Sequence, residues 1–513
     1  MRTKSALEYL ENTVSKNPYK VAVIEENASY TYKKLQDEAK IIGSAFHDIL
    51  NGKIQQPIML FMEKSFRCMA AMFGTMYSGN IYVPMDIKTP IDRLNSILST
   101  LESDIILTTR DEKNILEKIG YEGSVYIYEE IIEEYQTKVQ DKKLEDIQNR
   151  LVDADLMYIL FTSGSTGVPK GVAVAYRSIV DYIEAFMEEV SIMEDDVLGN
   201  QTPFYADMSL KDIYMSVYAG ATICIIPQKY FMSPKKLLQF LSENGVTSLS
   251  WVPTAYRIIA QFDGLSKIRP SMLKRFLFSG EAMPIAIFKY WKQFYSDGIY
   301  IQQYGPTEIT GACTSFLVER DYTDDETIPI GKPFRNTGIM LLDENDNEIK
   351  SNVQDTVGEI CVFGTCLAAG YYNNPQKTQE VFVQNPLVKG YESKIYRTGD
   401  LAKWDEEGNL VFISRKDYQI KHGGKRIELG EIEAAVQAIE NIKACCCVHN
   451  REKDALVLYY IGDISSKEIL QQLQEKIPKY MIPTVYHARN ELPILLNGKL
   501  NRKLMDEWAN DKK

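Results

Sequence analysis

The sequence predicts an α/β protein with a large N-terminal part built from βαβ-type subdomains, a small β-rich subdomain and a small C-terminal α+β domain. Short apolar runs alternate with helical patterns over most of the chain, the texture becomes β-rich after about residue 320, and a short closing segment has helices and strands of its own. At 513 residues the chain is too long for one ordinary domain.

The first elements are apolar runs followed by segments with apolar residues at helical spacing. The runs KVAVIEE, PIMLFM, ATICIIP and TSLSWVP alternate with segments such as TYKKLQDEAKIIGSAFHDIL and SPKKLLQFLSENG. This alternation indicates βαβ units and largely parallel sheets. We therefore expect ligands to bind in loops beyond the carboxyl ends of the strands.

The later elements are shorter. GIMLLDENDNEIK, VGEICVFG and NLVFISRKD predict strands separated by turns. The last segment predicts a helix in ELGEIEAAVQAIENI, a strand in KACCCVHN with a hairpin partner in ALVLYYIG, and a second helix in SKEILQQLQEKI. These elements suffice for a small α+β domain.

Composition restricts the classes of function. The net charge of −12 argues against binding to nucleic acid or to an anionic membrane surface. The first residues lack the apolar core of a signal peptide, and no run approaches 18 apolar residues. Eight cysteines without paired Cys-x2-Cys spacing, and four histidines without a Ser or Cys partner motif, predict no zinc site and a reduced cytoplasmic protein.

The stretch FTSGSTGVPKG, residues 161–171, contains almost no side chain that could build a core. The strand LMYILF before it should end near Phe161. Glycines permit positive φ and close approach of a ligand, while bare backbone N–H groups, hydroxyls and Lys170 suit the oxygens of a phosphate chain. The spacing is not that of a Walker A loop, and a flexible surface loop is the alternative interpretation.

An ordered series of motifs from about residue 29 to residue 503 resembles the adenylate-forming superfamily. Besides the glycine-rich stretch, the series comprises SYTYKKL, MYSGNIYVPMD, YGPTEIT, GEICVFGTCLAAGYYNNPQKTQEVF, YRTGDLAKWDEEGNLVFISRKDYQIKHGGKRIELGEIE and LPILLNGKLNRK. The wording is most similar to the amino-acid adenylation domains of non-ribosomal peptide synthetases and to D-alanine–carrier protein ligases.

The resemblance implies two reactions. A carboxylate attacks the α-phosphate of ATP, giving an acyl-AMP and pyrophosphate, and a thiol then attacks the acyl-AMP. Such displacement at phosphorus needs positioning and charge neutralisation more than covalent help. The glycine-rich loop would hold the β- and γ-phosphates through Thr162, Ser163, Gly164, Ser165, Thr166, Gly167 and Lys170.

The resemblance also assigns roles around the nucleotide. Asp400 would accept hydrogen bonds from both ribose hydroxyls, and Arg415 would contact the ribose. Glu308 would hold Mg2+, Thr307 would lie against the α-phosphate, and Tyr304 would flank the adenine. Without the motif series, Asp400 after Gly399 would be interpreted as a turn residue, and Tyr304 as an ordinary buried aromatic residue.

Lys499, in LNGKLN, resembles the lysine that touches the substrate carboxylate and the α-phosphate during adenylation. Asp417 falls where the family has a hinge, which divides the chain into a core at residues 1–416 and a small mobile domain at residues 417–513. The family rotates its small domain between the two reactions, and we expect the same here.

The stretch FYADMSLKDIYMSV aligns with the family motif whose Asp binds the substrate's α-amino group, and Asp207 matches that position. Lys211 would suit an acidic side chain such as glutamate or aspartate, although it could instead point to solvent or pair with Asp212. The other pocket positions implied by the alignment are Met208, Tyr256, Leu277, Ser279, Gln303, Gly311 and Ala312.

Two positions depart from the family pattern. Ala206 stands where an aromatic residue is usual, although Phe204 and Tyr205 come just before it, and Ser279 stands where D-alanine ligases tend to have Cys. We therefore expect a stand-alone amino-acid adenylating enzyme, requiring ATP and Mg2+, that loads the phosphopantetheine thiol of a separate carrier protein. The alternatives are a D-alanine–carrier protein ligase, a CoA ligase, and an inactive nucleotide-binding relative.

Overall fold

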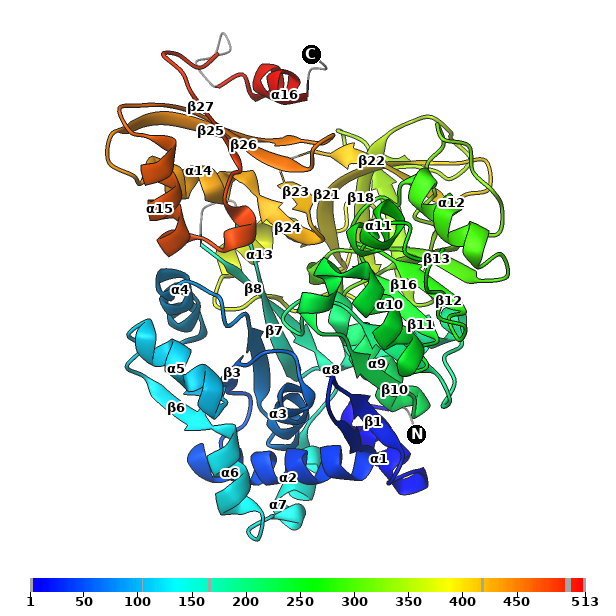
Figure 1. Cartoon of the computed structure of the whole chain (residues 1–513), viewed down its shortest axis with the longest axis vertical. Coiled ribbons are helices and arrows are strands. Elements are labelled where there is room, and N and C mark those ends of the chain that lie inside the picture. The colour runs from blue at the N-terminus through cyan, green and yellow to red at the C-terminus, as the bar shows by residue number, and fades with distance from the viewer. Residues whose placement is uncertain (1–2, 104, 165–167, 417–418, 494–499, 511–513) are drawn as a thin grey trace.

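The computed structural model describes residues 3–103, 105–164, 168–416, 419–493 and 500–510. Two large sheets lie side by side, an antiparallel sheet adjoins them, and the C-terminal segment sits across one end of all three (Figure 1). The predicted alternation of strands and helices is confirmed by this order of elements.

The first large sheet has seven strands in the order β19-β8-β7-β4-β3-β5-β6. Its strands β4, β3, β5, β6 and β7 run parallel, while β8 pairs antiparallel with β7. The strands are β3 (Pro57–Phe61), β4 (Ile81–Met85), β5 (Ile105–Thr108), β6 (Ser124–Ile127), β7 (Leu156–Thr162), β8 (Lys170–Ala175) and β19 (Gly370–Tyr371).

The second large sheet has nine strands in the order β15-β14-β13-β12-β11-β9-β10-β1-β2, and its six central strands are parallel. The strands are β1 (Val21–Ile24), β2 (Ser29–Thr31), β9 (Val197–Asn200), β10 (Thr222–Ile225), β11 (Ser248–Trp251), β12 (Arg275–Phe278), β13 (Ile299–Tyr304), β14 (Thr314–Leu317) and β15 (Lys332–Pro333).

Helices cover both large sheets. One hydrophobic core fills the space between the sheets, and smaller cores lie under the helices on the two outer faces. The helices of this part are α1 (Leu7–Lys16), α2 (Tyr32–Ile49), α3 (Phe66–Tyr77), α4 (Ile91–Leu101), α5 (Arg110–Lys118), α6 (Tyr128–Tyr135), α7 (Asp141–Arg150), α8 (Tyr176–Val190), α9 (Met208–Ala219), η1 (Gln228–Met232), α10 (Pro234–Glu243), α11 (Pro253–Gln261), α12 (Ile285–Phe294) and η2 (Thr307–Ile309).

The β-rich region expected after residue 320 is an antiparallel sheet in the order β17-β16-β18-β21-β20, with β22 paired to β21. Its elements are β16 (Thr337–Leu342), β17 (Glu348–Ile349), β18 (Gly358–Gly364), α13 (Pro375–Val381), β20 (Phe382–Gln384), β21 (Lys394–Trp404) and β22 (Leu410–Arg415).

The C-terminal segment has two hydrophobic clusters made only of residues from 420 onward. One cluster lies between a three-stranded sheet and the helices α14 and α15, and the other lies under α16 on the opposite face of that sheet. The elements are β23 (Gln419–His422), β24 (Lys425–Glu428), α14 (Leu429–Gln437), β25 (Ile442–Asn450), β26 (Ala455–Gly462), α15 (Ser466–Lys476), η3 (Lys479–Met481), β27 (Val485–Ala488) and α16 (Arg502–Asn510).

The glycine-rich stretch differs in one respect from the expectation. Lys170 does not lie in a loop, because it begins strand β8 and pairs in register with Thr162 of β7. The stretch therefore connects two paired antiparallel strands, with Thr162 and Lys170 opposite each other. Gly164 is required there, since a Cβ atom on it would lie 2.0 Å from the carbonyl oxygen of Val168.

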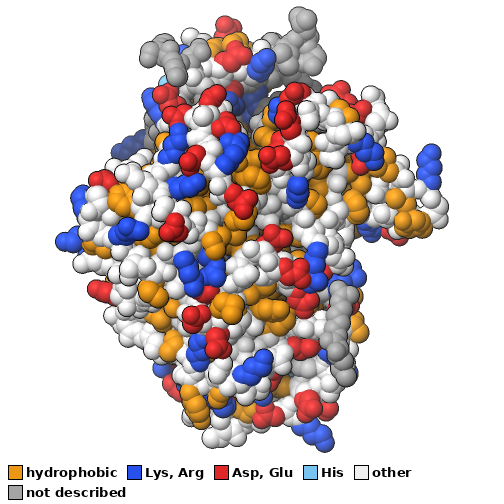
Figure 2. Space-filling view, turned by 90° about the vertical axis from the view of Figure 1, so that its right-hand side faces the viewer, with side chains coloured by type: hydrophobic (Ala, Val, Ile, Leu, Met, Phe, Trp, Pro, Cys, Tyr) orange, Lys and Arg blue, Asp and Glu red, His pale blue; other side chains and the backbone are white. Residues whose placement is uncertain are grey.

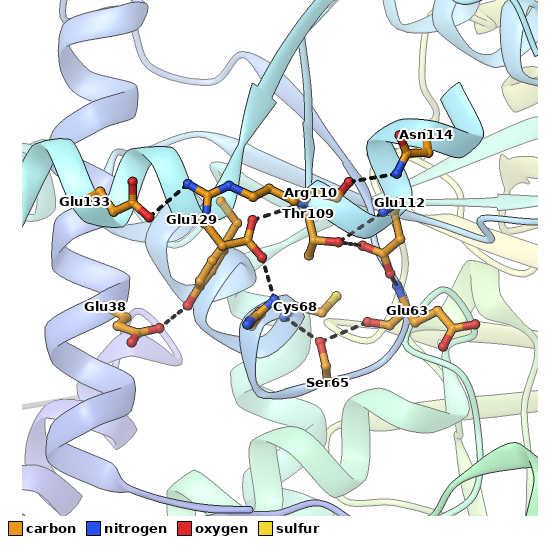
Figure 3. Close-up of polar contacts among 12 residues, drawn as sticks. Glu38, Glu63, Ser65, Cys68, Thr109, Arg110, Glu112, Asn114, Glu129 and Glu133 are labelled. Atoms are coloured by element: carbon orange, nitrogen blue, oxygen red, sulfur yellow. Dashed lines mark hydrogen bonds and ion pairs between the residues drawn. The ribbon is translucent and has the colours of Figure 1, made fainter. Parts of the chain in front are cut away.

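A polar network holds the loop after β3 against the neighbouring helices. The Glu112 carboxylate accepts a hydrogen bond from the Glu63 backbone N–H at 2.7 Å, and Ser65 caps helix α3 by accepting from the Cys68 backbone N–H (Figure 3). Glu129 accepts from the Arg110 backbone N–H, which ties α6 to α5. These contacts hold the loop that carries Lys64 against helix α5.

On the face shown in Figure 2, acidic and basic side chains are interspersed rather than gathered by sign. Within the described part of the chain, no helix combines the length and the apolar character that crossing a membrane requires.

Helices α2 and α3 are in unusually close contact, which gives the first prediction. A Cβ atom on Gly74 would lie 2.6 Å from Cβ of Ile42 and 2.9 Å from the Ala39 carbonyl oxygen. We expect Gly74→Ala to lower the free energy of unfolding by about 1–3 kcal/mol because of this overpacking. Urea denaturation measures the loss, and Lys142→Ala, on the exposed face of α7, should change stability by less than about 0.5 kcal/mol.

Candidate active site

A cleft of about 1030 Å3 opens where the C-terminal segment meets the large sheets. Its walls come from residues beyond the carboxyl ends of parallel strands, from β21 and β22, and from the hairpin β23–β24. The hairpin lies between the three-stranded sheet and the rest of the protein (Figure 1). Location at strand ends is where ligands of such sheets bind.

Asp207 and Thr307 meet at the centre of this cleft. Asp207 precedes helix α9 and Thr307 begins η2 after strand β13, and the Thr307 hydroxyl donates to the Asp207 carboxylate at 2.7 Å. Burial raises the pKa of Asp207, and the hydrogen bond from Thr307 acts in the opposite direction. The carboxylate predicted to bind an ammonium group therefore stands directly beside the predicted α-phosphate contact.

Glu308 is completely buried and fully engaged. Its carboxylate accepts a hydrogen bond from the Tyr371 hydroxyl at 2.8 Å and pairs with the Arg426 guanidinium at 2.6 Å. Burial alone would raise the pKa of Glu308, but the charges of Arg426 and Lys170 lower it to about 2. Glu308 is thus an ionised oxygen ligand of the kind that Mg2+ prefers, and a cation from the C-terminal segment neutralises it here.

Asp400 is held in place from two sides. Arg415 donates to one carboxylate oxygen at 2.5 Å and the Tyr304 hydroxyl donates to the other at 2.5 Å. Register explains the first contact, since Asp400 of β21 pairs with Arg415 of β22. The three predicted nucleoside residues therefore form one group, and a carboxylate retains acceptor capacity for ribose hydroxyls after two such bonds.

The glycine-rich hairpin faces the C-terminal segment. The Ser163 hydroxyl donates to the Arg426 carbonyl oxygen, the Gly164 backbone N–H donates to the Glu431 carboxylate at 3.1 Å, and Lys170 lies 3.5 Å from Glu428. Burial, together with the Arg426 charge, lowers the pKa of Lys170. Donors predicted to bind phosphates are thus occupied by protein oxygens.

Thr162 extends the same surface. Its hydroxyl oxygen is buried and has no hydrogen-bond partner within the described residues. Ser165, Thr166 and Gly167 lie outside the residues that the structure describes.

The hairpin β23–β24 supplies cleft residues to which sequence reasoning gave no role. Lys421 lies over the Tyr304 ring at 5.8 Å, and Lys425 donates to the Tyr205 hydroxyl at 3.2 Å. The Gly424 backbone N–H donates to Glu281 at 2.6 Å, at a position where a Cβ atom would lie 2.6 Å from Val252. The sequence feature that could have indicated these residues is a pair of lysines, Lys421 and Lys425, on either side of Gly423 and Gly424.

Lys64 was also missed. Its ammonium donates to the Gln201 carbonyl oxygen at 2.8 Å and to the Asn200 carbonyl oxygen at 3.2 Å at the edge of the cleft. Burial lowers the pKa of Lys64 to about 7. The position of this charge could not be predicted from neighbouring residues, because the partners, the last residue of β9 and the residue after it, are 136 and 137 positions away.

The predicted side-chain pocket contains a buried polar group. Lys211 is 2% exposed, so it does not point to solvent, and its ammonium donates to Gln303 at 2.7 Å and to Ser279 at 3.3 Å. Burial lowers the pKa of Lys211 to about 8. Among the described residues, the Gln303 amide nitrogen has no hydrogen-bond acceptor.

The remaining predicted pocket residues fall into three groups. Met208, Ser279 and Gly311 line the cleft, while Leu277 and Ala312 are buried beside it. Tyr256 lies outside the cleft wall, in the core beneath the nine-stranded sheet, where its hydroxyl donates to the Leu277 carbonyl oxygen at 3.1 Å. Loop lengths near this position had obscured its alignment.

The departure at Ala206 is compensated by its neighbour. Ala206 and Tyr205 both line the cleft, and Phe204 is 2% exposed. Tyr205 therefore supplies an aromatic surface one residue before the expected place.

Asp417 and Lys499 lie outside the described residues. Leu492 and Leu500 are described residues on either side of Lys499 in the sequence. Both pack in the cluster under α16, on the face of the three-stranded sheet opposite α14 and α15.

These features define an enzyme of the adenylate-forming class, and comparison with known proteins agrees. A family model described as AMP-binding enzyme matches residues 10–372. The chain belongs to this AMP-binding enzyme family, and the resemblance inferred from the motifs is confirmed.

Curated relatives match along the whole chain. Tyrocidine synthase 1 of Brevibacillus parabrevis is 30% identical over 511 residues, which are 98% of this chain and 45% of the relative. Zwittermicin A synthase ZmaJ of Bacillus cereus is 30% identical over 512 residues, covering 98% of this chain and 94% of the relative. The chain thus spans about half the length of some relatives and nearly all of another.

Solved structures confirm the predicted fold class. The Vibrio cholerae adenylation domain AlmE, in complex with glycyl-adenosine-5'-phosphate, has a TM-score of 0.85 at 21% identity and covers 99% of this chain and 98% of its own. An artificially fused adenylation–PCP di-domain protein from Klebsiella oxytoca has a TM-score of 0.80 at 20% identity, covering 95% and 94%.

The contacts of the glycine-rich hairpin give the second prediction. Replacing Glu428 by Gln removes the carboxylate that would compete with ATP phosphates for Lys170. If the lost contact is worth about 0.5–1 kcal/mol, KM for ATP should fall about two- to fivefold. Steady-state kinetics measure this fall, and the exposed Glu440→Gln in the same segment should leave KM unchanged. An unchanged KM in Glu428→Gln would contradict the competition.

Proposed function

We propose that this chain activates an amino acid with ATP as an aminoacyl-AMP and then transfers the aminoacyl group to the phosphopantetheine thiol of a carrier protein. The observation that carries the proposal is the hydrogen bond from the Thr307 hydroxyl to the Asp207 carboxylate. It joins an ammonium-binding carboxylate to the residues around Glu308 and Asp400, so an amino acid bound at Asp207 would present its carboxylate to the nucleotide.

In the first reaction, a substrate carboxylate oxygen attacks the α-phosphorus of ATP, the bond to the bridging oxygen breaks, and pyrophosphate leaves with the electron pair. Asp400, with Tyr304 and Arg415, would orient the ribose. Thr162, Ser163, Gly164 and Lys170 would bind the departing phosphates, together with Ser165, Thr166 and Gly167 of the same glycine-rich sequence. Positioning and charge neutralisation of this kind carry most of the catalysis in phosphoryl chemistry.

Mg2+ fits the site through Glu308, because this carboxylate is ionised and the cation that now neutralises it comes from the hairpin β23–β24. When bound, Mg2+ would neutralise charge on phosphate oxygens. Arg426 must withdraw for the carboxylate to be available.

A two-lobe organisation, residues 1–416 and residues 417–513 with a hinge at Asp417, accounts for these requirements. The separate hydrophobic clusters after residue 420 support it. With the hairpin in the cleft, as described, the glycine-rich donors are occupied, which suits the state that follows pyrophosphate release. Rotation of the small lobe would withdraw Arg426 and bring Lys499 to the reacting carboxylate.

The substrate we propose is an acidic amino acid. Lys211 already has two acceptors, and an ammonium group can donate three hydrogen bonds. The unpaired amide nitrogen of Gln303 is a second buried donor at the same place. A substrate carboxylate would satisfy both donors, and buried donors left unpaired cost free energy.

Two other assignments predict different substrates. A D-alanine–carrier protein ligase would leave Lys211 and Gln303 without a substrate partner, and Ser279 replaces the cysteine that such ligases tend to have. A CoA ligase would not need Asp207, since its fatty or aryl acid has no ammonium group. A relative that only binds nucleotide would show no amino-acid-dependent reaction.

The third prediction tests the activity itself. Amino-acid-dependent exchange of pyrophosphate into ATP should occur with glutamate or aspartate. Lys499→Ala should reduce this exchange by about 100-fold or more, because a charge stabilising the transition state is lost, while ATP binding persists. Exchange confined to D-alanine or other small apolar amino acids would rule out the acidic substrate, and no exchange with any amino acid would rule out the enzyme.

The fourth prediction concerns pH. Lys211 is positively charged below its pKa of about 8 and loses the charge as pH rises through that value. We expect kcat/KM for an acidic amino acid to fall about tenfold per pH unit above pH 8. In Lys211→Met, kcat/KM should be lower at pH 7 and no longer show this fall. The same pH profile in wild type and Lys211→Met would exclude Lys211 as its origin.

A further inference from the structure

Two of the four histidines converge on one carboxylate outside the cleft. His422 is the last residue of β23, His449 lies in β25, and Asp454 lies just before β26. No sequence motif indicates this group, because its members lie up to 32 residues apart.

The three side chains direct ligand-type atoms at one point. Nδ1 of His422 lies 3.0 Å from Oδ1 of Asp454, and Nε2 of His449 lies 2.8 Å from the same oxygen. The three atoms all lie within 4.8 Å of one another, and the imidazole rings are nearly perpendicular at 80°. The group is half-buried, so a solvent molecule could reach it.

We propose that His422, His449 and Asp454 form a binding site for a divalent transition-metal ion of the zinc type. Two imidazole nitrogens and one carboxylate oxygen are ligands that Zn2+ accepts, with water as the fourth ligand of a tetrahedron. Metal–ligand bonds of about 2.1 Å place tetrahedral ligand atoms roughly 3.4 Å apart. Small side-chain rotations would convert the observed separations into that geometry.

The donor set also selects the class of metal. Imidazole nitrogen suits Zn2+, Co2+ and Ni2+, whereas Mg2+ and Ca2+ prefer sites made only of oxygen. Arg451, two residues after His449, is paired with Asp506 at 3.0 Å rather than with Asp454. The site is therefore distinct from the Mg2+ position at Glu308 in both place and chemistry.

Metal binding here would connect the active-site hairpin to the sheet behind it. His422 immediately precedes Gly423 and Gly424, which line the cleft, and the Gly424 N–H donates to Glu281. A bond from His422 through the metal to β25 and β26 would anchor the base of that hairpin within the C-terminal segment. This inference does not depend on the proposed function, since it concerns metal binding alone.

The fifth prediction tests the site by titrating the full chain with Co2+, whose tetrahedral complexes absorb visible light, and by displacing Co2+ with Zn2+. We expect a one-to-one complex in wild type and at least about tenfold weaker binding in His449→Gln and in Asp454→Asn. His487→Gln is the matched control, because His487 of β27 stacks on Tyr459 of β26, away from the three ligands. This variant should bind Co2+ as wild type does. Circular dichroism checks the folding of each variant.

A second measurement locates the metal. Zn2+ should slow amide hydrogen exchange in residues 419–428 of wild type and of His487→Gln, but not of Asp454→Asn. The proposal fails if wild type gives no visible Co2+ spectrum, if His449→Gln or Asp454→Asn binds as tightly as the control, or if the spectrum carries the intense thiolate bands of cysteine ligation. In that case the two histidines serve only as hydrogen-bond partners of Asp454.

Discussion

The arrangement of the active site depends on the neutralisation of one buried carboxylate. Glu308 has no exposed surface, and an ionised carboxylate removed from water must find an opposite charge or hydrogen-bond donors. Arg426 and Tyr371 provide both. Because Arg426 belongs to the hairpin β23–β24, the same ion pair holds the C-terminal segment against the cleft.

Further contacts of the same kind follow from that placement. Glu428 and Glu431 approach the glycine-rich hairpin, and Glu431 also pairs with the buried Arg93 of helix α4. The acidic groups of the C-terminal segment thus face the cations and N–H donors that nucleotide phosphates would use. Nucleotide and C-terminal segment would compete for one set of charges, and such competition would couple nucleotide binding to movement of the segment.

Much of the fold could be predicted from the chain alone. Apolar periodicity identified β1, α2, β25 and β26, because such patterns depend only on near neighbours in sequence. Part of the candidate site could be predicted: Asp207, Thr307 and Glu308 follow strands β9 and β13, and Asp400 lies within β21. Asp207, Thr307 and Asp400 line the cleft. The burial of Tyr256 in the core could not be predicted, since its hydroxyl donates to the Leu277 carbonyl oxygen, 21 positions away.

The sequence alone determined which chemical groups the site can offer, namely carboxylates, hydroxyls and a glycine-rich segment, and which strands lead to them. Folding alone established which of these groups meet. Arg426 and Glu308 are 118 positions apart, and Gly164 and Glu431 are 267 apart. Contacts over such separations arise from the packing of whole sheets and segments, and no local pattern encodes the partner that a buried charge finds.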